Sequence, residues 1–344
     1  MKKRILVAGG TGYIGSHTVV ELQNNGYEVI IVDNLSNSRA DVVDSIEQIT
    51  GIRPAFEKVD CLDYEGMDAV FTKYPGIEGI IHFAASKAVG ESVQKPLLYY
   101  RNNLVSLINI LELMPKHGVK GIIFSSSCTV YGQPDVLPVT EAAPIKKAES
   151  PYGNTKQINE EIIDDTIASG SPIKAIKLRY FNPIGAHPSA LIGELPNGVP
   201  QNLVPFLTQT AMGIREKLSV FGDDYDTPDG SCIRDYIYVV DLAKAHVIAM
   251  NRILEGKQKQ PSEVFNVGTG RGLSVLELIN AFESSTGVKL NYQIAPRRAG
   301  DIVKVWADPS YANNELGWKA DTSIEDTLRS AWNWQVHLRE KGIM

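Results

Sequence analysis

Three side chains in this sequence could form one catalytic unit: Ser127, Tyr152 and Lys156. Tyr152 and Lys156 directly follow Ser150-Pro151 and are four residues apart, so in a helix they lie on the same face, one turn apart. A free tyrosine has a pKa of about 10. To act as a base at neutral pH it needs positive charge nearby, and Lys156 and an oxidised nicotinamide ring would both provide it. We therefore predict that Tyr152 is a general base assisted by Lys156.

Ser127 lies just past an expected buried strand, in the run Ser125-Ser126-Ser127-Cys128. There its hydroxyl could bridge a substrate hydroxyl and Tyr152. The Tyr-Lys spacing alone is also that of an ordinary helix pair. The catalytic interpretation therefore depends on the strand-end serine and on the glycine motif near the N-terminus.

The glycine motif consists of Gly9, Gly12 and Gly15, between a strand expected at 4–8 and a helix expected at 13–25. Alone, these glycines could simply make a tight turn. Between a strand and a helix, they let backbone approach a pyrophosphate at the helix N-terminus. Asp33 ends the next strand, where a carboxylate accepts hydrogen bonds from ribose hydroxyls and repels a 2′-phosphate. The motif therefore predicts NAD rather than NADP.

The elements that would position these residues form a repeating pattern. Short apolar runs at 4–8, 28–32, 80–83, 121–125 and 173–178 alternate with helical stretches, which predicts an α/β fold with a Rossmann-type doubly wound parallel sheet. After Tyr180 the sequence becomes rich in Pro and Gly. We expect an NAD-binding domain over 1–181, with 236–262 packed back on it, and a smaller C-terminal α/β substrate domain over 182–344. Two later helices should begin at capping boxes, Ser274 with Glu277 and Thr322 with Glu325.

Composition excludes several classes of function. The 344 residues are 43% hydrophobic with a net charge of −6, typical of a packed globular protein, and the longest basic cluster is residues 2–4. We therefore expect no nucleic-acid partner. A strand-like run begins within four residues of Met1 and no apolar stretch is long enough for a membrane span, so we expect no signal peptide and no membrane insertion. Cys61, Cys128 and Cys232 lack the spacing of a zinc site or disulfide framework, so we expect no metal and a cytoplasmic location.

Beyond these motifs, the sequence resembles the UDP-glucose 4-epimerases, a family of extended short-chain dehydrogenases/reductases, over nearly its whole length. The similar segments are 12–17, 33–35 and 82–92 in the cofactor region, and 179–183, 202–205, 221–222, 234–236 and 296–301 in the second region. One departure is Ala8, where the family usually has Thr.

The resemblance implies roles for individual residues. Cofactor contacts are implied for Gly9, Gly12, Tyr13, Ile14, Gly15, Asp33, Asn34, Asp60, Cys61, Phe83, Ala84, Lys87, Asn102, Tyr152, Lys156 and Tyr180. Substrate contacts are implied for Lys87, Ser127, Tyr152, Phe181, Asn182, Asn202, Leu203, Phe221, Arg234, Arg298, Asp301 and Val305. Physically, two arginines could clamp a diphosphate and Phe221 could pack against uracil, although an arginine of this kind taken alone is more often part of a surface ion pair.

The resemblance also implies a reaction. Tightly bound NAD would transiently oxidise the sugar at C4, and the 4-keto sugar would turn about its bond to UDP and be reduced on its other face, interconverting UDP-galactose and UDP-glucose. Val305 stands where some members carry a bulky Tyr. The smaller side chain predicts room for UDP-N-acetylglucosamine and UDP-N-acetylgalactosamine as well.

Other functions remain open at this point. They include another NAD-dependent UDP-sugar-modifying enzyme, such as a decarboxylase, dehydratase or reductase, and a non-enzymatic dinucleotide sensor. A 4,6-dehydratase typically has an Asp-Glu pair where this sequence has Cys128-Thr129. Family habit further implies a homodimer formed through helices around 97–114 and 151–168, with a role in galactose metabolism.

Overall fold

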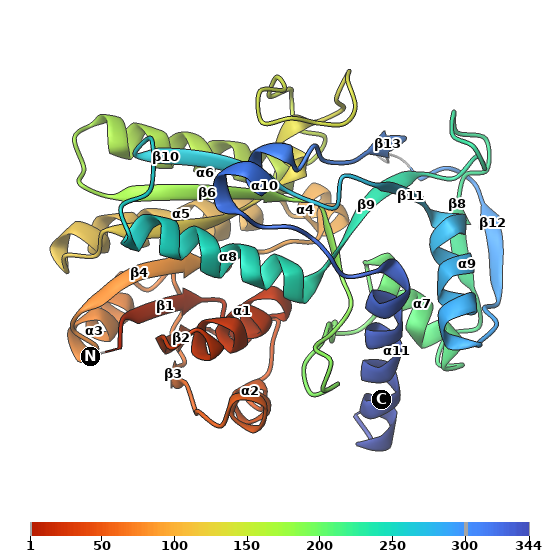
Figure 1. Cartoon of the computed structure of the whole chain (residues 1–344), viewed down its shortest axis with the longest axis horizontal. Helices are drawn as coiled ribbons and strands as arrows, with labels where there is room; N and C mark the ends of the chain where they lie inside the picture. Colours follow the sequence, from red (N-terminus) through yellow and green to blue (C-terminus); the bar gives the residue numbers. More distant parts are fainter. Residues whose placement is uncertain (1, 299–301, 344) are drawn as a thin grey trace.

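The computed structural model describes residues 2–298 and 302–343. Within them, seven parallel strands form the central sheet in the order β10-β6-β5-β4-β1-β2-β3 (Figure 1). The strands are β1 (Arg4–Ala8), β2 (Glu28–Val32), β3 (Ala55–Glu57), β4 (Ile77–His82), β5 (Gly121–Ser127), β6 (Lys174–Tyr180) and β10 (Ser262–Val267). This confirms the predicted doubly wound fold.

Helices cover both faces of the sheet, which is why its strands are almost continuously apolar. Alternate residues of β1 enter different cores: Ile5 and Val7 pack on one face, Leu6 and Ala8 on the other. The first face is covered by α1 (Tyr13–Asn24), α2 (Val42–Thr50), α8 (Val239–Leu254) and α10 (Ser310–Leu316). The second is covered by α3 (Tyr64–Lys73), α5 (Pro96–Lys116) and α6 (Pro151–Ala168), and the short α4 (Val89–Gln94) packs on α5 and α6.

The sheet reverses its strand order between β1 and β4. From β1 the chain builds outward through β2 and β3, then returns to the other side of β1 with β4, β5 and β6. Ligands of open parallel sheets bind outside the carboxyl ends of the strands at such a switch point. The loops after β1, β2, β4 and β5 all open toward this edge.

The later part of the chain forms a smaller layer, at the right of Figure 1. Strands β11, β9 and β13 lie side by side, β7 pairs with β9, and β8 pairs with β12. The bounds are β7 (Asn182–Ile184), β8 (Leu218–Phe221), β9 (Ile233–Tyr238), β11 (Gly272–Ser274), β12 (Tyr292–Ala295), β13 (Lys304–Val305), α7 (Leu203–Ala211), α9 (Val275–Thr286) and α11 (Ile324–Glu340). Leu207, Leu278, Phe282 and Leu328 form the centre of its own core.

The chain returns from this smaller layer to the central sheet. Helix α8 packs against α1 and the sheet, and β10 then pairs with β6 at the sheet edge. The returning segment therefore runs on to Val267, beyond the 236–262 expected from the sequence.

The two predicted capping boxes have different outcomes. Ser274 and Glu277 form the box, which confirms that prediction. The second was wrong by one residue, since Ser323 caps α11 and accepts the Asp326 N–H. The Thr322 N–H instead donates to Asp241 Oδ2 at 3.1 Å, a tertiary contact that holds Thr322 outside the helix.

The described residues hold neither a helix suited to a membrane nor a ready-made metal site. Within residues 2–298 and 302–343, no helix is long and apolar enough to cross a membrane. The same residues contain no group of three or more His, Cys, Asp or Glu side chains arranged to hold a metal ion.

Candidate active site

Helix α6 presents the predicted Tyr-Lys pair at its N-terminal end. Ser150 caps the helix by accepting the Gly153 N–H at 3.2 Å, and Pro151 occupies the first turn, where a missing N–H costs nothing. The cap fixes where the helix begins. Tyr152 and Lys156 therefore lie on the turns that pass the carboxyl end of β5.

Lys156 is almost fully buried and directly bonded to β5. It is 3% exposed, its Nζ donates to the Ser125 carbonyl oxygen at 2.6 Å, and Nζ lies 5.8 Å from the centre of the Tyr152 ring. Burial lowers the pKa of Lys156 to about 8, and the charge of Glu160 opposes this shift. Lys156 is thus a cation that can lose its proton near physiological pH.

Ser127 is the last residue of β5, which extends two residues beyond the predicted strand end at Ser125. Its Oγ accepts the Thr129 N–H at 3.2 Å, and the side chain lies near enough to Tyr152 to lower the pKa of that phenol. Burial raises the pKa of Tyr152, the neighbouring Tyr180 raises it further, and Ser127 lowers it. From the protein's own groups, the net effect on the Tyr152 pKa is therefore a rise, whereas the sequence predicted that Lys156 would lower it.

The glycine loop after β1 has the close contacts that a dinucleotide cradle needs. Gly9 has a φ of 81°, and a Cβ there would come within 2.8 Å of the Ala84 nitrogen. A Cβ on Gly15 would come within 2.2 Å of the Gly9 oxygen. Helix α1 starts after Gly12, and no described side chain caps it or places an acid in its first turn. Its N-terminus is therefore suited to a pyrophosphate, with Tyr13 and Ile14 in the first turn.

Asp33 follows β2 and is held rigidly. Its carboxylate accepts the N–H of Thr11 at 3.2 Å, the N–H of Leu35 at 2.9 Å and the hydroxyl of Ser38 at 3.0 Å. Next to it, Asn34 Nδ2 donates to Asp60 Oδ2 at 2.9 Å, and Cys61 is buried. These residues fit the adenosine half of NAD.

The loop after β4 closes the other side of the cradle. The N–H groups of Phe83 and Ala84 both donate to the Ala8 oxygen, at 2.8 and 3.0 Å. Further along, Asn102 Nδ2 donates to Ser86 Oγ at 3.1 Å, and Lys87 Nζ lies 5.9 Å from the centre of the Tyr13 ring. On β6, the Tyr180 hydroxyl hydrogen-bonds to Ser125.

The predicted substrate residues come from several segments of the smaller layer. Asn182 begins β7, Asn202 and Leu203 stand at the start of α7, and Arg234 on β9 is the register neighbour of Val305 on β13. The Arg298 guanidinium lies 5.4 Å from the centre of the Phe221 ring. Phe221 is 40% exposed, so part of its side chain is open to solvent. Asp301 lies outside the described residues.

Val305 and Phe181, both predicted as substrate contacts, are buried. Val305 is 3% exposed, and both side chains pack in one apolar cluster with Val130 and Tyr131, which Cys128 adjoins. Burial raises the pKa of Cys128 to about 12. Val305 therefore forms part of the wall behind Cys128.

Sequence reasoning missed one residue that joins two predicted contacts. Glu194 Oε1 accepts both Lys87 Nζ at 3.2 Å and Asn202 Nδ2 at 2.6 Å, and its backbone oxygen accepts Trp334 Nε1 at 3.1 Å. No local pattern signals this role, since Lys87 is 107 residues away in the chain.

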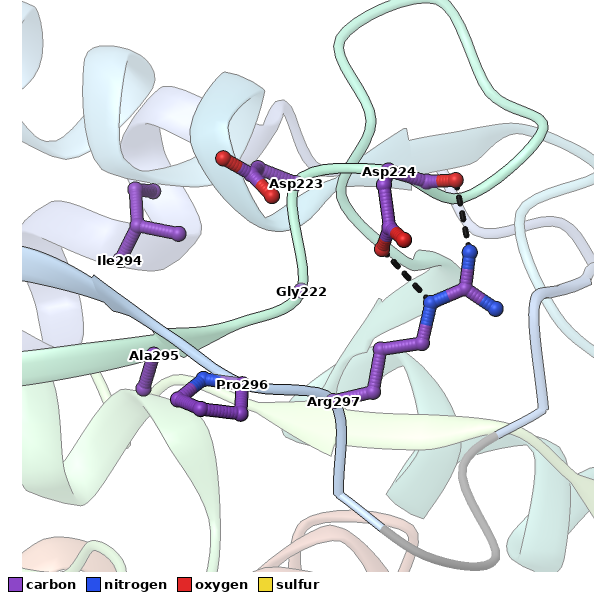
Figure 2. A pocket seen from close by; sticks show the side chains of 7 residues that line it. All are labelled: Gly222, Asp223, Asp224, Ile294, Ala295, Pro296 and Arg297. Carbon is purple, nitrogen blue, oxygen red and sulfur yellow. Dashed lines mark hydrogen bonds and ion pairs between the residues drawn. The ribbon is translucent and has the colours of Figure 1, made fainter.

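A separate surface pocket of about 390 Å³ lies where β8 and β12 end (Figure 2). Its lining is Gly222, Asp223, Asp224, Ile294, Ala295, Pro296 and Arg297. Arg297 Nε donates to Asp224 Oδ1 at 2.6 Å across it. None of these lining residues was predicted as a site residue, although Gly222 and Arg297 adjoin Phe221 and Arg298 in the chain.

The glycine cradle lies at the switch point of the sheet, and Ser127, Tyr152 and Lys156 lie at the same carboxyl end of its strands. Together these features define an enzyme of the extended short-chain dehydrogenase/reductase class. A family model described as GDP-mannose 4,6 dehydratase matches residues 6–331. The UDP-glucose 4-epimerase of Bacillus subtilis is 50% identical over 331 residues, which cover 96% of each chain. That of Homo sapiens is 46% identical over 341 residues, or 97% of each chain.

Solved structures agree. A UDP-glucose 4-epimerase from Stenotrophomonas maltophila with bound NAD and formylated UDP-arabinopyranose has a TM-score of 0.95 and 47% identity, covering 98% of this chain and 99% of its own. One from Bifidobacterium longum in complex with NAD⁺ and UDP has a TM-score of 0.93 and 48% identity, covering 97% and 98%. The chain belongs to the UDP-glucose 4-epimerase family.

Proposed function

We propose that this protein is an NAD-dependent UDP-hexose 4-epimerase that interconverts UDP-galactose and UDP-glucose. The observation that carries the proposal is the Ser127, Tyr152 and Lys156 group beside the glycine cradle, in a chain that matches epimerases over nearly its full length. When bound, NAD would supply reversible hydride acceptance at sugar C4. The residues that would hold it are Gly9, Gly12, Gly15 and Asp33, with Lys87 and Asn102 nearer the sugar side.

The protein's own groups would move the proton of the 4-hydroxyl. Tyr152, as a phenolate stabilised by the buried Lys156 cation, takes this proton and becomes a neutral phenol, while Ser127 orients the sugar hydroxyl. The nucleotide must stay anchored while the 4-keto sugar turns over. Arg234, Arg298 and Asn202 would hold the diphosphate, and Phe221 the uracil ring.

A dehydratase is the second candidate to consider, because the matching family model carries that description. Eliminating water needs an acid and a base near the sugar. The positions where a dehydratase has its Asp-Glu pair hold Cys128, with a pKa raised by burial to about 12, and Thr129. Neither titrates near neutral pH, so the structure favours epimerisation.

We also infer the wider setting of the reaction. The enzyme works in the cytoplasm, in galactose metabolism, as a homodimer built on α5 and α6. Leu97 at 81% and Leu98 at 49% exposed support an interface at the start of α5.

The test is to incubate the purified protein with UDP-galactose, without added NAD, and to follow the sugar signals by proton NMR. UDP-glucose should appear, because the cofactor remains bound through purification. Tyr152→Phe is the matched variant, and it should lower kcat by about 10²–10⁴ while UDP still binds. A dehydrated or decarboxylated product would instead support another enzyme of the class.

A further inference from the structure

The face of α6 that carries Tyr152 and Lys156 continues to Glu160. Residues four apart in a helix share a face, so these three side chains form one stripe along α6. Glu160 is 6% exposed and has no place in the chemistry proposed above. A carboxylate buried this deeply is costly unless it is paired and hydrogen-bonded.

Glu160 is bonded to both strands beneath the helix. Its Oε1 accepts the Ser126 hydroxyl at 2.5 Å and Arg179 Nε at 2.9 Å, and its Oε2 accepts Arg179 Nη2 at 2.5 Å. Ser126 and Arg179 are register neighbours on β5 and β6. One carboxylate therefore joins α6 to the two strands that end at the catalytic edge.

The Ser126 contact lies between two catalytic ones. Ser125 accepts Lys156 through its carbonyl, Ser126 donates to Glu160, and Ser127 is the proposed partner of Tyr152. If α6 moved along β5, all three contacts would change together. A break between Glu160 and Ser126 would thus let Tyr152 move relative to Ser127.

Arg179 is itself held in place. Its Nη1 donates to the Tyr131 hydroxyl at 3.0 Å, and that hydroxyl donates to Asn266 Oδ1 at 2.6 Å. A buried network with its groups satisfied specifies a single arrangement of the elements it joins. The link therefore runs from α6 through β6 to β10.

Glu160 also acts on Lys156 through charge. Burial lowers the pKa of Lys156, and the Glu160 carboxylate opposes it. The other titratable groups near Lys156 are His82 on β4, Tyr152 on α6 and Tyr180 on β6, which neighbours Tyr152. Burial lowers the pKa of His82 to about 3. His82 is uncharged at neutral pH, so Glu160 supplies the negative charge that opposes the lowering of the Lys156 pKa.

We propose that Glu160 is a positioning residue of this site: with Ser126 and Arg179 it holds α6 against β5, so that Tyr152 and Lys156 stay in place beside Ser127. The inference rests on the proposed epimerase function.

The test compares Glu160→Gln with Glu263→Gln. Glu263 on β10 is 5% exposed and pairs with Arg252 of α8, Nε to Oε2 at 2.7 Å, so both variants remove one charge from a buried Arg–Glu pair. Both should lower the melting temperature. Only Glu160→Gln should lower kcat, by about tenfold to a hundredfold as expected for a misplaced catalytic group, with the KM for UDP-galactose and the calorimetric affinity for UDP unchanged.

The pH profile separates positioning from simple destabilisation. In the parent, kcat should fall at alkaline pH as Lys156 loses its proton. In Glu160→Gln the Arg179 charge is left unopposed, so Lys156 should lose its proton at lower pH and the fall in kcat should move to lower pH. In Glu263→Gln the fall should stay in place. Ser126→Ala, which keeps the ion pair, should also lower kcat and serves if Glu160→Gln does not fold. Two results would overturn the inference in a parent protein that converts UDP-galactose. One is a Glu160→Gln variant with the same kcat and pH profile as Glu263→Gln. The other is a Ser126→Ala variant with the kcat of the parent. A parent that converts nothing overturns the proposed function itself.

Discussion

Lys156 is the residue whose charge and environment conflict most. Burial lowers the pKa of Lys156 to about 8 in the folded protein, whereas the ordinary pKa of a lysine is 10.5. A folded pKa below the unfolded one is a stability penalty that is full below pH 8 and disappears as pH rises toward 10.5. The penalty is tolerated because the cation next to Tyr152 serves the chemistry.

Replacing Lys156 with Met should therefore abolish turnover and raise stability. At pH 7 we expect the free energy of unfolding to increase by about 1–3 kcal/mol, less than the full shift because the bond to Ser125 is lost. The gain should shrink between pH 8 and pH 10.5. Urea unfolding across this pH range measures it, and a variant less stable than the parent at pH 7 would contradict the assigned environment.

For Val305 we propose a role in a different property, the choice of sugar. It stands in the wall behind Cys128, packed with Phe181 and Tyr131. Val305→Tyr should suppress activity on UDP-N-acetylhexosamines selectively, because the larger ring fills the space next to the sugar 2-substituent. The quantity to measure is the ratio of kcat/KM for UDP-N-acetylglucosamine and UDP-glucose, in which any loss of folded enzyme cancels. An equal loss on both substrates would refute this role.

At the scale of elements, the turn between β1 and α1 has very little steric freedom. Gly15→Ala places a methyl group 2.2 Å from the Gly9 oxygen, so the turn must open and α1 must shift. We expect the purified variant to contain much less than one NAD per chain, measured by releasing and quantifying the nucleotide. Gly90→Ala is the matched control, since a Cβ there meets nothing within 4 Å. Full NAD content in Gly15→Ala would contradict the assignment of this turn to the cofactor.

Elements set by local pattern were predictable from the sequence. The strand at 4–8, the glycine loop and the helix carrying Tyr152 each have short-range signals, namely apolar runs, turn glycines and the Ser150-Pro151 start. The edge position of β10 was not predictable, because its partner β6 lies far away in the chain. The one-residue shift from Thr322 to Ser323 has a similar cause, the tertiary bond to Asp241.

The site residues also divide into those with a local sequence signal and those brought together only by the fold. Glu160 could have been found by extending the four-residue spacing of Tyr152 and Lys156 by one more turn. Glu194 could not, because its two partners come from different parts of the fold and only the folded chain brings them to one oxygen.

At the scale of the whole molecule, the proposed dimer is tested at its most exposed apolar residue. Leu97→Glu puts a charge at the start of α5 and should convert a dimer into a monomer in sedimentation experiments, because an unpaired charge cannot be buried at an interface. Val136→Glu is the control, since Val136 is 73% exposed and belongs to neither α5 nor α6. A parent that sediments as a monomer, or a Leu97→Glu variant that remains a dimer, would rule out this interface.

The most direct test of the central claim uses UDP-galactose with deuterium at C4. The protein, purified without added NAD, is incubated with this substrate in ordinary water, and the product is examined by proton and deuterium NMR. Oxidation and reduction at C4 within one closed site predict UDP-glucose that keeps its deuterium at C4. Absence of UDP-glucose, or UDP-glucose whose deuterium has been replaced by solvent hydrogen, would contradict the account.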